Sequence, residues 1–184
     1  MDFILDAQLF QWLYGWLHQP PWISMMSRLT HLGDYQVVMS LAYVGFLVSA
    51  AGWLKAGRKT ALPLAPWLGI PAAVSVAGWL KVVVARPRPL EAIALFGAAS
   101  SELRRSFPSG HATLIFALAA IFALRWPRWQ VVWWVLAFGV AVSRVALGVH
   151  WPSDVIAGAL ISCGMVSSLS WIEQRLRVIG RSTR

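Results

Sequence analysis

The stretch that decides the fold begins with Lys81-Val-Val-Val-Ala-Arg-Pro-Arg88-Pro89, continues with Pro108-Ser109-Gly110-His111, and ends with Ser143-Arg144-Val-Ala-Leu-Gly-Val-His150-Trp-Pro-Ser-Asp154. These three polar clusters interrupt a sequence that is otherwise almost entirely apolar. They supply cations, two histidines, a hydroxyl, a glycine before an apolar run, and one carboxylate. Such groups suit a phosphate site, and the apolar runs around them predict helices that hold the site at a membrane surface.

The composition predicts an integral membrane protein. Of the 184 residues, 58% are hydrophobic and only 12% are charged, whereas an average soluble domain has about 25% charged residues. Twelve tryptophans suit a surface that faces lipid, with aromatic side chains at the two interfaces. Apolar runs recur through the whole chain and leave no polar face, which excludes a soluble helical protein.

The charged residues and the single cysteine exclude other classes of function. The net charge of +9 does not indicate nucleic-acid binding, because the basic residues stand in short clusters between apolar runs. The lone Cys163 excludes an intrachain disulfide and a cysteine-rich metal site. Asp2 and Asp6 occupy the place of the basic region of a signal peptide, so we expect none.

The first 34 residues predict short helices instead of a full span. Residues 3–18 are apolar but carry polar side chains, and they are fewer than the about 20 residues that cross a bilayer core. Pro20-Pro21 then breaks the helix, and residues 22–32 form a second short apolar piece. We expect an interfacial helix anchored by Trp12, Tyr14 and Trp16. A broken span made of both pieces is the alternative.

Five apolar runs predict membrane spans. Prolines within the second run are tolerated, because neighbouring helices can satisfy the carbonyls that proline leaves free. The runs are Val37–Leu54, Leu62–Leu80, Ala112–Leu124, Val131–Val142 and Val155–Ile172. We therefore expect an all-α, polytopic transmembrane helix bundle of five spans, with six as the alternative. It forms a single domain over residues 1–184, with the polar clusters at 81–154.

The basic residues between the spans predict the orientation of the bundle. Lys55 and Arg58, then Arg125 and Arg128, and the basic C-terminal tail all fall on one side, which the positive-inside rule makes cytoplasmic. The three polar clusters then fall together on the opposite side. The clusters also carry basic residues, which the positive-inside rule alone would not place on that side. Binding of phosphate accounts for them.

The first two clusters offer groups that bind anions. Lys81 and Arg88 lie seven positions apart, about two helical turns, although the prolines beside Arg88 favour an extended exit from the span. Ser109 is a candidate N-cap of the next helix, where Gly110 and its neighbours would present amides to an anion. Each cluster alone also has a purely structural explanation. The first could be cations that snorkel at a helix end, and the second a capped helix beside a solvated His111.

The third cluster offers a nucleophile. His150 and Asp154 are four positions apart, and Pro152 starts the last span between them. A carboxylate bonded to one imidazole nitrogen leaves the other nitrogen free as a nucleophile. The helix dipole alone would explain an acid at a helix start, but it explains neither His150 nor Arg144.

In combination, the clusters read Lys-x6-Arg-Pro, Pro-Ser-Gly-His and Ser-Arg-x5-His-x3-Asp. This pattern resembles the three-part signature of the type 2 phosphatidic acid phosphatase superfamily. All three parts are complete, in the expected order and embedded in membrane spans, and the resemblance covers residues 81–154 directly. It implies a metal-independent phosphatase without a cofactor, which forms a phosphohistidine intermediate.

The resemblance also implies a role for each residue of the signature. His150 would attack the phosphorus and Asp154 would orient it, while His111 would protonate the leaving oxygen and later activate water. Arg86 falls in the variable part of the first motif, so only a supporting role is expected. The residues that would hold the phosphoryl oxygens are Lys81, Arg88, Ser109, Gly110 and Arg144.

Several substrates are compatible with the resemblance. Small bacterial members of the family act on undecaprenyl diphosphate, phosphatidylglycerophosphate or lipid A. An outward-facing site and the short loop from Leu90 to Phe107 favour undecaprenyl diphosphate, recycled to undecaprenyl phosphate at the bacterial inner membrane. A lipid phosphotransferase shares the first half-reaction and is an alternative. The expected partners are the lipid substrate and membrane lipids, with no nucleic acid and no obligate protein partner.

Two other classes fit the sequence poorly. Soluble vanadium-dependent haloperoxidases share the signature, but the membrane composition argues against them. A transporter or scaffold with a degenerate site is disfavoured because no residue of the signature is missing.

Overall fold

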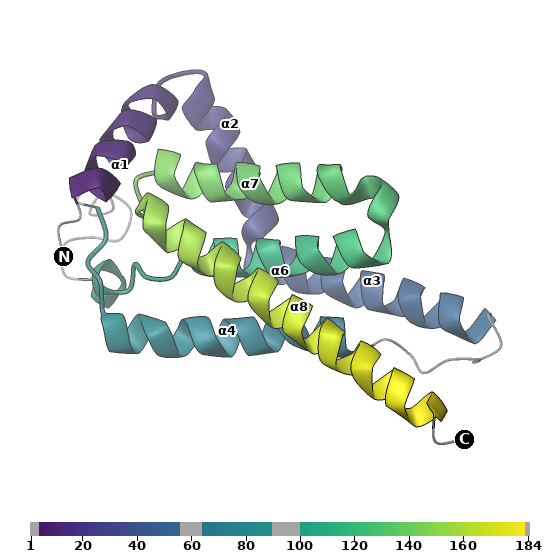
Figure 1. Ribbon diagram of the computed structural model, residues 1–184. Coiled ribbons are helices and arrows are strands. Elements are labelled where there is room, and N and C mark those ends of the chain that lie inside the picture. Colours follow the sequence, from purple (N-terminus) through teal and green to yellow (C-terminus); the bar gives the residue numbers. More distant parts are fainter. Residues whose placement is uncertain (1–3, 56–63, 90–99, 183–184) are drawn as a thin grey trace.

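The computed structural model describes residues 4–55, 64–89 and 100–182, and these ranges consist of helices joined by turns (Figure 1). The described ranges contain no strand, and the predicted all-α bundle is confirmed. The α-helices are α1 Ile4–Leu17, α2 Trp22–Leu29, α3 Tyr35–Lys55, α4 Ala65–Val84, α6 Gly110–Arg125, α7 Gln130–Ala146 and α8 Pro152–Ser182. Short 3-10 helices are η1 Thr30–Gly33, η3 Ser101–Arg104 and η4 Pro127–Trp129.

Five of the helices correspond to the five predicted spans. Helices α3, α4 and α8, and α7 together with η4, are long and apolar enough to cross a bilayer, and α6 is a shorter apolar helix. Successive helices run in opposite directions, so α4 and α7 end where α6 and α8 begin (Figure 1). The predicted start of the second span, at Leu62, lies outside the described residues.

Helix α8 continues beyond the predicted end of the last span, from Ile172 to Ser182. Its polar end is stabilised by side chains of the helix itself. The guanidinium of Arg177 donates to Glu173 at 2.6 Å, one turn away, and Arg175 lies over the ring of Trp171. Arg175 and Arg177, predicted to follow the last span, are therefore part of α8.

The N-terminal segment forms two short helices that are separated at Pro20-Pro21, as predicted. Helix α1 lies against the ends of α7 and α8 and does not run along the bundle (Figure 1). Phe10 packs on the ring of Trp151, and His18 Nδ1 lies 3.0 Å from the carbonyl of Ala146. Trp12 and Trp16 are exposed, and the interfacial position of α1 stays a prediction.

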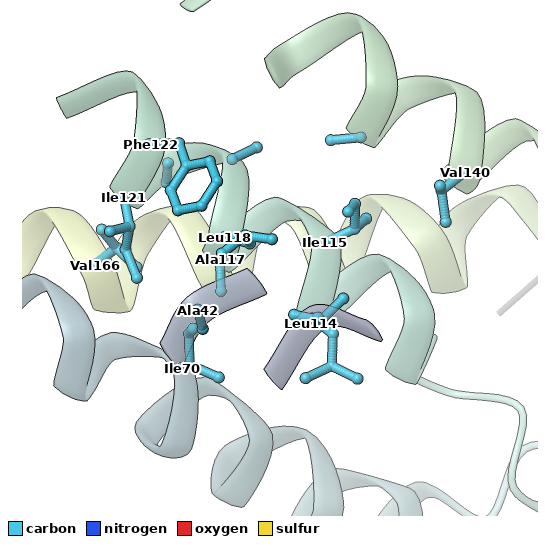
Figure 2. Packing of buried hydrophobic residues seen from close by; sticks show 14 residues of the cluster. Ala42, Ile70, Leu114, Ile115, Ala117, Leu118, Ile121, Phe122, Val140 and Val166 are labelled. Carbon is cyan, nitrogen blue, oxygen red and sulfur yellow. The ribbon is translucent and has the colours of Figure 1, made fainter. Parts of the chain in front are cut away.

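The core surrounds α6, which packs against α4, α7 and α8 (Figure 2). Small residues let the helices approach closely, which is how helices associate within lipid. At Gly69 a Cβ atom would lie 2.5 Å from Cγ2 of Val166 on α8. At Gly158 it would lie 2.8 Å from the carbonyl oxygen of Ser109, so α8 passes directly beside the start of α6.

The outer surface of the bundle is apolar. Large hydrophobic side chains are exposed on the outward faces of the long helices, among them Leu41, Val44, Val135, Phe138 and Leu160. A soluble protein rarely exposes so much contiguous apolar surface. The chain is therefore an integral membrane protein whose long helices face lipid.

Candidate active site

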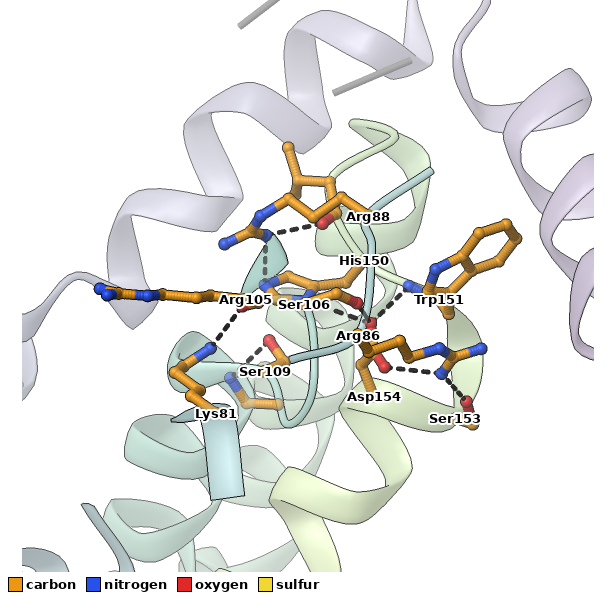
Figure 3. Close-up of polar contacts among 12 residues, drawn as sticks. Lys81, Arg86, Arg88, Arg105, Ser106, Ser109, His150, Trp151, Ser153 and Asp154 are labelled. Carbon is orange, nitrogen blue, oxygen red and sulfur yellow. Dashed lines mark hydrogen bonds and ion pairs between the residues drawn. The ribbon is translucent and has the colours of Figure 1, made fainter. Parts of the chain in front are cut away.

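The three polar clusters meet at one end of the bundle (Figure 3). Helix α4 ends where Ala85 adopts a left-handed conformation with φ of 44°, and the chain then runs extended. Backbone hydrogen bonds join this segment to the one before α6: Ser106 N donates to the Arg86 carbonyl and Arg88 N to the Leu103 carbonyl. The first cluster is thereby fixed beside the second.

His150 lies between a carboxylate and a guanidinium. Its Nδ1 is 3.4 Å from Oδ2 of Asp154, and the side chain of His150 is only 2% exposed. Nη1 of Arg88 donates to Nε2 of His150 at 3.1 Å and to the carbonyl of Val149 at 2.7 Å. These partners assign the proton to Nδ1 and leave the lone pair of Nε2 facing Arg88.

Burial sets the charge of the imidazole. Burial lowers the pKa of His150 to about 3; the charges of Arg88 and Arg144 act in the same direction, and Asp154 opposes them. The ring is therefore neutral near pH 7, as a nitrogen nucleophile must be.

Asp154 is fully buried and accepts hydrogen bonds from several donors besides His150. Nη1 of Arg86 donates at 2.7 Å, the amide of Trp151 at 2.9 Å, and the hydroxyl of Ser106 also donates. Because these bonds favour the ionised carboxylate, Asp154 remains negatively charged beside His150.

Arg86 connects Asp154 to the N-terminal helix. Its Nη1 also donates to the hydroxyl of Ser153 at 2.6 Å, and its Nη2 donates to Oδ2 of Asp6 on α1 at 2.6 Å. Asp6 in turn accepts from the amide and the hydroxyl of Ser153. A buried arginine with carboxylates on two sides balances the charge that Asp154 brings into the interior.

The second cluster forms the start of α6. Ser109 is the N-cap, as predicted, and its hydroxyl accepts from the amide of Ala112. The Cε atom of Lys81 lies 4.0 Å from the position of a Cβ atom at Gly110, and Nζ of Lys81 donates to the carbonyl of Arg105 at 3.0 Å. The lysine side chain therefore passes beside Gly110 at this helix start.

The remaining cation and histidine of the signature contact the segment before α3. Nη1 of Arg144 donates to the hydroxyl of Thr30 at 2.8 Å, and Nε2 of His111 is 2.9 Å from Oδ1 of Asp34. Nε of Arg144 is buried and has no hydrogen-bond partner among the described residues. A guanidinium with a spare buried donor is suited to an anion.

All eight predicted site residues lie at this end of the bundle. Arg88 and Asp154 contact His150 directly, and Arg88 and Arg144 lie within electrostatic range of both histidines. The predicted site residues are Lys81, Arg88, Ser109, Gly110, His111, Arg144, His150 and Asp154.

Sequence reasoning missed the polar residues that support the site from outside the signature. Asp6 and Asp34 are the clearest cases, since each is an acid within a largely apolar segment. That rarity is a usable signal, but it does not say which cation or histidine each acid contacts. Arg86 was expected only to support the site, and its bonds to Asp154 and Asp6 define that support.

Comparisons with known proteins agree on the family. The model of the PAP2 superfamily matches residues 37–177. Lipid A 1-phosphatase from Rhizobium etli is 33% identical over 172 residues, which cover 84% of this chain and 73% of that protein. "Putative undecaprenyl-diphosphatase YbjG" from Escherichia coli is 32% identical over 173 residues, which cover 90% of this chain and 80% of that protein.

The solved structure of LpxE from Aquifex aeolicus has the same fold. The TM-score is 0.72 at 23% sequence identity, and the match covers 91% of this chain and 96% of that one.

Proposed function

Since the chain belongs to the PAP2 superfamily, we propose that it removes a phosphoryl group from a membrane lipid through a phosphohistidine at His150. The observation that carries the proposal is the position of His150, buried between Asp154 and Arg88 with the Nε2 lone pair toward the cations. Asp154 holds Nδ1–H and stabilises the positive charge that develops on the ring during attack.

In the first step, Nε2 of His150 attacks phosphorus. The N–P bond forms as the bond from phosphorus to the lipid oxygen breaks, and His111 gives a proton to that oxygen. The dephosphorylated lipid leaves and a phosphoryl group remains on His150. Arg88, which donates to Nε2 in the free site, then turns its donors to a phosphoryl oxygen.

In the second step, water replaces His150. His111, now neutral, takes a proton from water, the water oxygen attacks phosphorus, and the N–P bond breaks. Inorganic phosphate leaves and His150 is neutral again. The charge on the phosphoryl oxygens is held throughout by Lys81, Arg88 and Arg144 and by the amides at Gly110.

Undecaprenyl diphosphate is our first candidate for the substrate. The relative YbjG, named for that reaction, aligns with nearly the whole chain. Arg104 and Arg105 are exposed next to the segment that carries the first cluster, and they offer further positive charge to a second phosphate group. The second candidate is the 1-phosphate of lipid A, since lipid A 1-phosphatases align over a similar length.

The site faces away from the cytoplasm in this proposal, and the host membrane is a bacterial inner membrane. The positive-inside rule supports it: Lys55, Arg125 and Arg128 are at the bundle end opposite to the candidate site. An undecaprenyl carrier released outside the cytoplasm would be dephosphorylated there.

The experiment is a phosphate-release panel with the purified full chain in detergent. It compares undecaprenyl diphosphate, lipid A, phosphatidylglycerophosphate and phosphatidate, each with excess chelator and without it. We expect release with chelator present, and the fastest release from undecaprenyl diphosphate. Fastest release from lipid A would select the second candidate, and strict dependence on added divalent metal would contradict the mechanism.

The intermediate is tested in the same preparation. Acid quenching during turnover should trap an acid-labile, base-stable phosphoenzyme, and the His150→Ala variant should give neither phosphoenzyme nor release. Normal phosphate release by His150→Ala would refute the proposal.

A further inference from the structure

A third acid, Asp34, lies at the candidate site. One carboxylate oxygen, Oδ1, is 2.9 Å from Nε2 of His111, and the other, Oδ2, is 2.9 Å from Nδ1 of His31. Asp34 thus bridges a half-buried histidine of the signature and an exposed histidine outside it. No residue of the three-part signature makes this contact with His111 among the described residues.

The backbone before Asp34 lies close to His111. Helix η1 packs against α6 and α7, and Gly33 lies directly beside His111. A Cβ atom at Gly33 would lie 2.7 Å from Cγ1 of Val140 and 3.1 Å from Cδ2 of His111. Only glycine allows this close approach, which brings the carboxylate of the next residue to the imidazole.

The same short segment holds a second group of the site. Thr30, three residues before Gly33, accepts the hydrogen bond from Arg144. Residues 30–34 therefore contact both a cation and a histidine of the signature from one side.

The charges around Asp34 favour its ionised form. Burial raises the pKa of the carboxyl, but hydrogen bonds from His31 and His111 and the charges of both histidines outweigh it, so the pKa lies below its usual value. Within the described part of the chain, Arg144 on α7 is also in electrostatic range of Asp34, and Arg88 lies in range of His111. Burial lowers the pKa of His111 to about 4 and both arginines act in the same direction, whereas Asp34 raises this pKa.

We propose that Asp34 is the positioning residue of His111: it orients the imidazole and stabilises the imidazolium that protonates the leaving oxygen. Each histidine of the reaction then has a carboxylate of its own, Asp154 for His150 and Asp34 for His111. Both carboxylates favour positive charge on their imidazole. Asp154 stabilises the charge that develops on His150 during attack, and Asp34 favours the proton that His111 gives to the leaving oxygen, against burial and the charges of two arginines.

The proposal assigns a smaller part to His31. Its hydrogen bond fixes the second oxygen of Asp34 and so the orientation of the carboxylate toward His111. Because His31 is largely exposed, water can replace this bond in part. We therefore expect a weaker effect from His31→Gln than from Asp34→Asn.

The test rests on the proposed phosphatase activity and uses the leaving group to isolate the acid. The full chain in detergent is assayed with phosphatidate, whose leaving oxygen needs a proton, and with p-nitrophenyl phosphate, whose leaving group does not. Asp34→Asn keeps the size of the side chain and removes its charge. It should lower kcat for phosphatidate about 10- to 100-fold, part of the ~10²–10⁴-fold that a general acid contributes. The loss with p-nitrophenyl phosphate should be much smaller.

The pH profile supplies a readout that a purely structural role would not move. Loss of the carboxylate makes His111 lose its proton at lower pH, so the basic limb of kcat/KM for phosphatidate should move to lower pH. Asp34→Glu should restore part of the rate and of the profile. Gln36→Ala, at an exposed polar residue two positions away, should match the wild type.

The outcomes separate this inference from the proposed function. If the wild type releases phosphate and His150→Ala does not, the phosphatase assignment holds and the Asp34 variants decide the rest. Equal losses on both substrates, or an unmoved basic limb, would overturn the role of Asp34. An Asp34→Asn enzyme as active as the wild type on phosphatidate would do so as well.

Discussion

His150 is held neutral by its surroundings, and this has a consequence for stability. The pKa of an unfolded histidine is about 6.5, whereas burial lowers the pKa of His150 to about 3 in the folded chain. Between these values the unfolded chain binds a proton that the folded chain does not. Stability therefore falls as the pH decreases from about 6.5 toward about 3.

We predict that the melting temperature of the purified protein drops between pH 7.5 and pH 5, and that His150→Gln shows a smaller drop. Glutamine keeps a polar side chain but takes up no proton, so the difference between the two slopes isolates His150. Differential scanning fluorimetry in one detergent measures both proteins. Equal slopes would show that His150 is not protected from protonation in the folded chain.

Arg86 permits a second prediction at the scale of one side chain. Arg86→Lys keeps the charge, but an ammonium cannot reproduce the fork that bonds Asp154, Ser153 and Asp6 together. Breaking a buried ion pair costs about 3–5 kcal/mol, and the lysine should recover only part of that. We expect lower thermal stability and slower phosphate release, since Asp154 loses a partner.

The matched control is Arg175→Lys, at the opposite end of α8, where the arginine lies over Trp171. It should leave both the melting temperature and the rate near those of the wild type. A stable and fully active Arg86→Lys enzyme would mean that Ser106 and Trp151 alone hold Asp154 in place.

The residues of the site were predictable only where a local pattern carries them. Lys81, His150 and their signature partners stand at fixed spacings that the sequence displays. Asp6 and Asp34 reach the site from residues far away in the chain, and their contacts depend on how α1 and η1 pack. No spacing along the sequence encodes such a contact.

Among the elements, α8 makes the sharpest prediction, because two of its glycines have opposite surroundings. A Cβ atom at Gly158 would meet the carbonyl of Ser109 at 2.8 Å and the amide of Thr113 at 3.0 Å, whereas at Gly164 it would meet nothing within 4 Å. Gly158→Ala must push α8 away from the start of α6. Moving these helices apart displaces Asp154, on α8, from Ser109, the N-cap of α6, whose amide donates to the Asp154 carbonyl.

We therefore expect Gly158→Ala to lower the melting temperature and to reduce phosphate release at least about 10-fold, since small misplacements at a reacting centre are costly. Gly164→Ala should match or slightly exceed the wild type in stability, because alanine is the better helix former. Similar behaviour of the two variants would show that α8 does not need close contact with α6.

The helices themselves follow from the apolar runs, and their ends follow less well. Helix α4 extends past Leu80 to Val84, because three valines follow Lys81, and it stops before Pro87. Helix α8 continues through Glu173 and Arg177, and the only sign of this ion pair in the sequence is their i, i+4 spacing. Hydropathy marks what enters lipid, but it does not mark where a helix continues into water.

For the whole molecule, the prediction concerns which side of the membrane the site faces. In a Cys163→Ser background, Arg104→Cys marks the end that carries the candidate site and Lys55→Cys marks the opposite end. Both positions are exposed. A membrane-impermeant thiol reagent should label Arg104→Cys in intact spheroplasts, and Lys55→Cys only after the membrane is opened. Labelling of Lys55→Cys alone in intact cells would invert the orientation.

The signature residues all gather at one end of a bundle whose flanks are apolar, and this makes the chemistry one-sided. In the proposed mechanism a lipid headgroup meets His150 only from the leaflet on that side, so lipid in the opposite leaflet has to flip before it can react. In a vesicle with uniformly oriented protein, phosphate release should therefore stop once the accessible leaflet is consumed. Further release should then proceed only as fast as lipid crosses the bilayer. A lipid flippase in the same membrane would therefore set the rate of phosphate release.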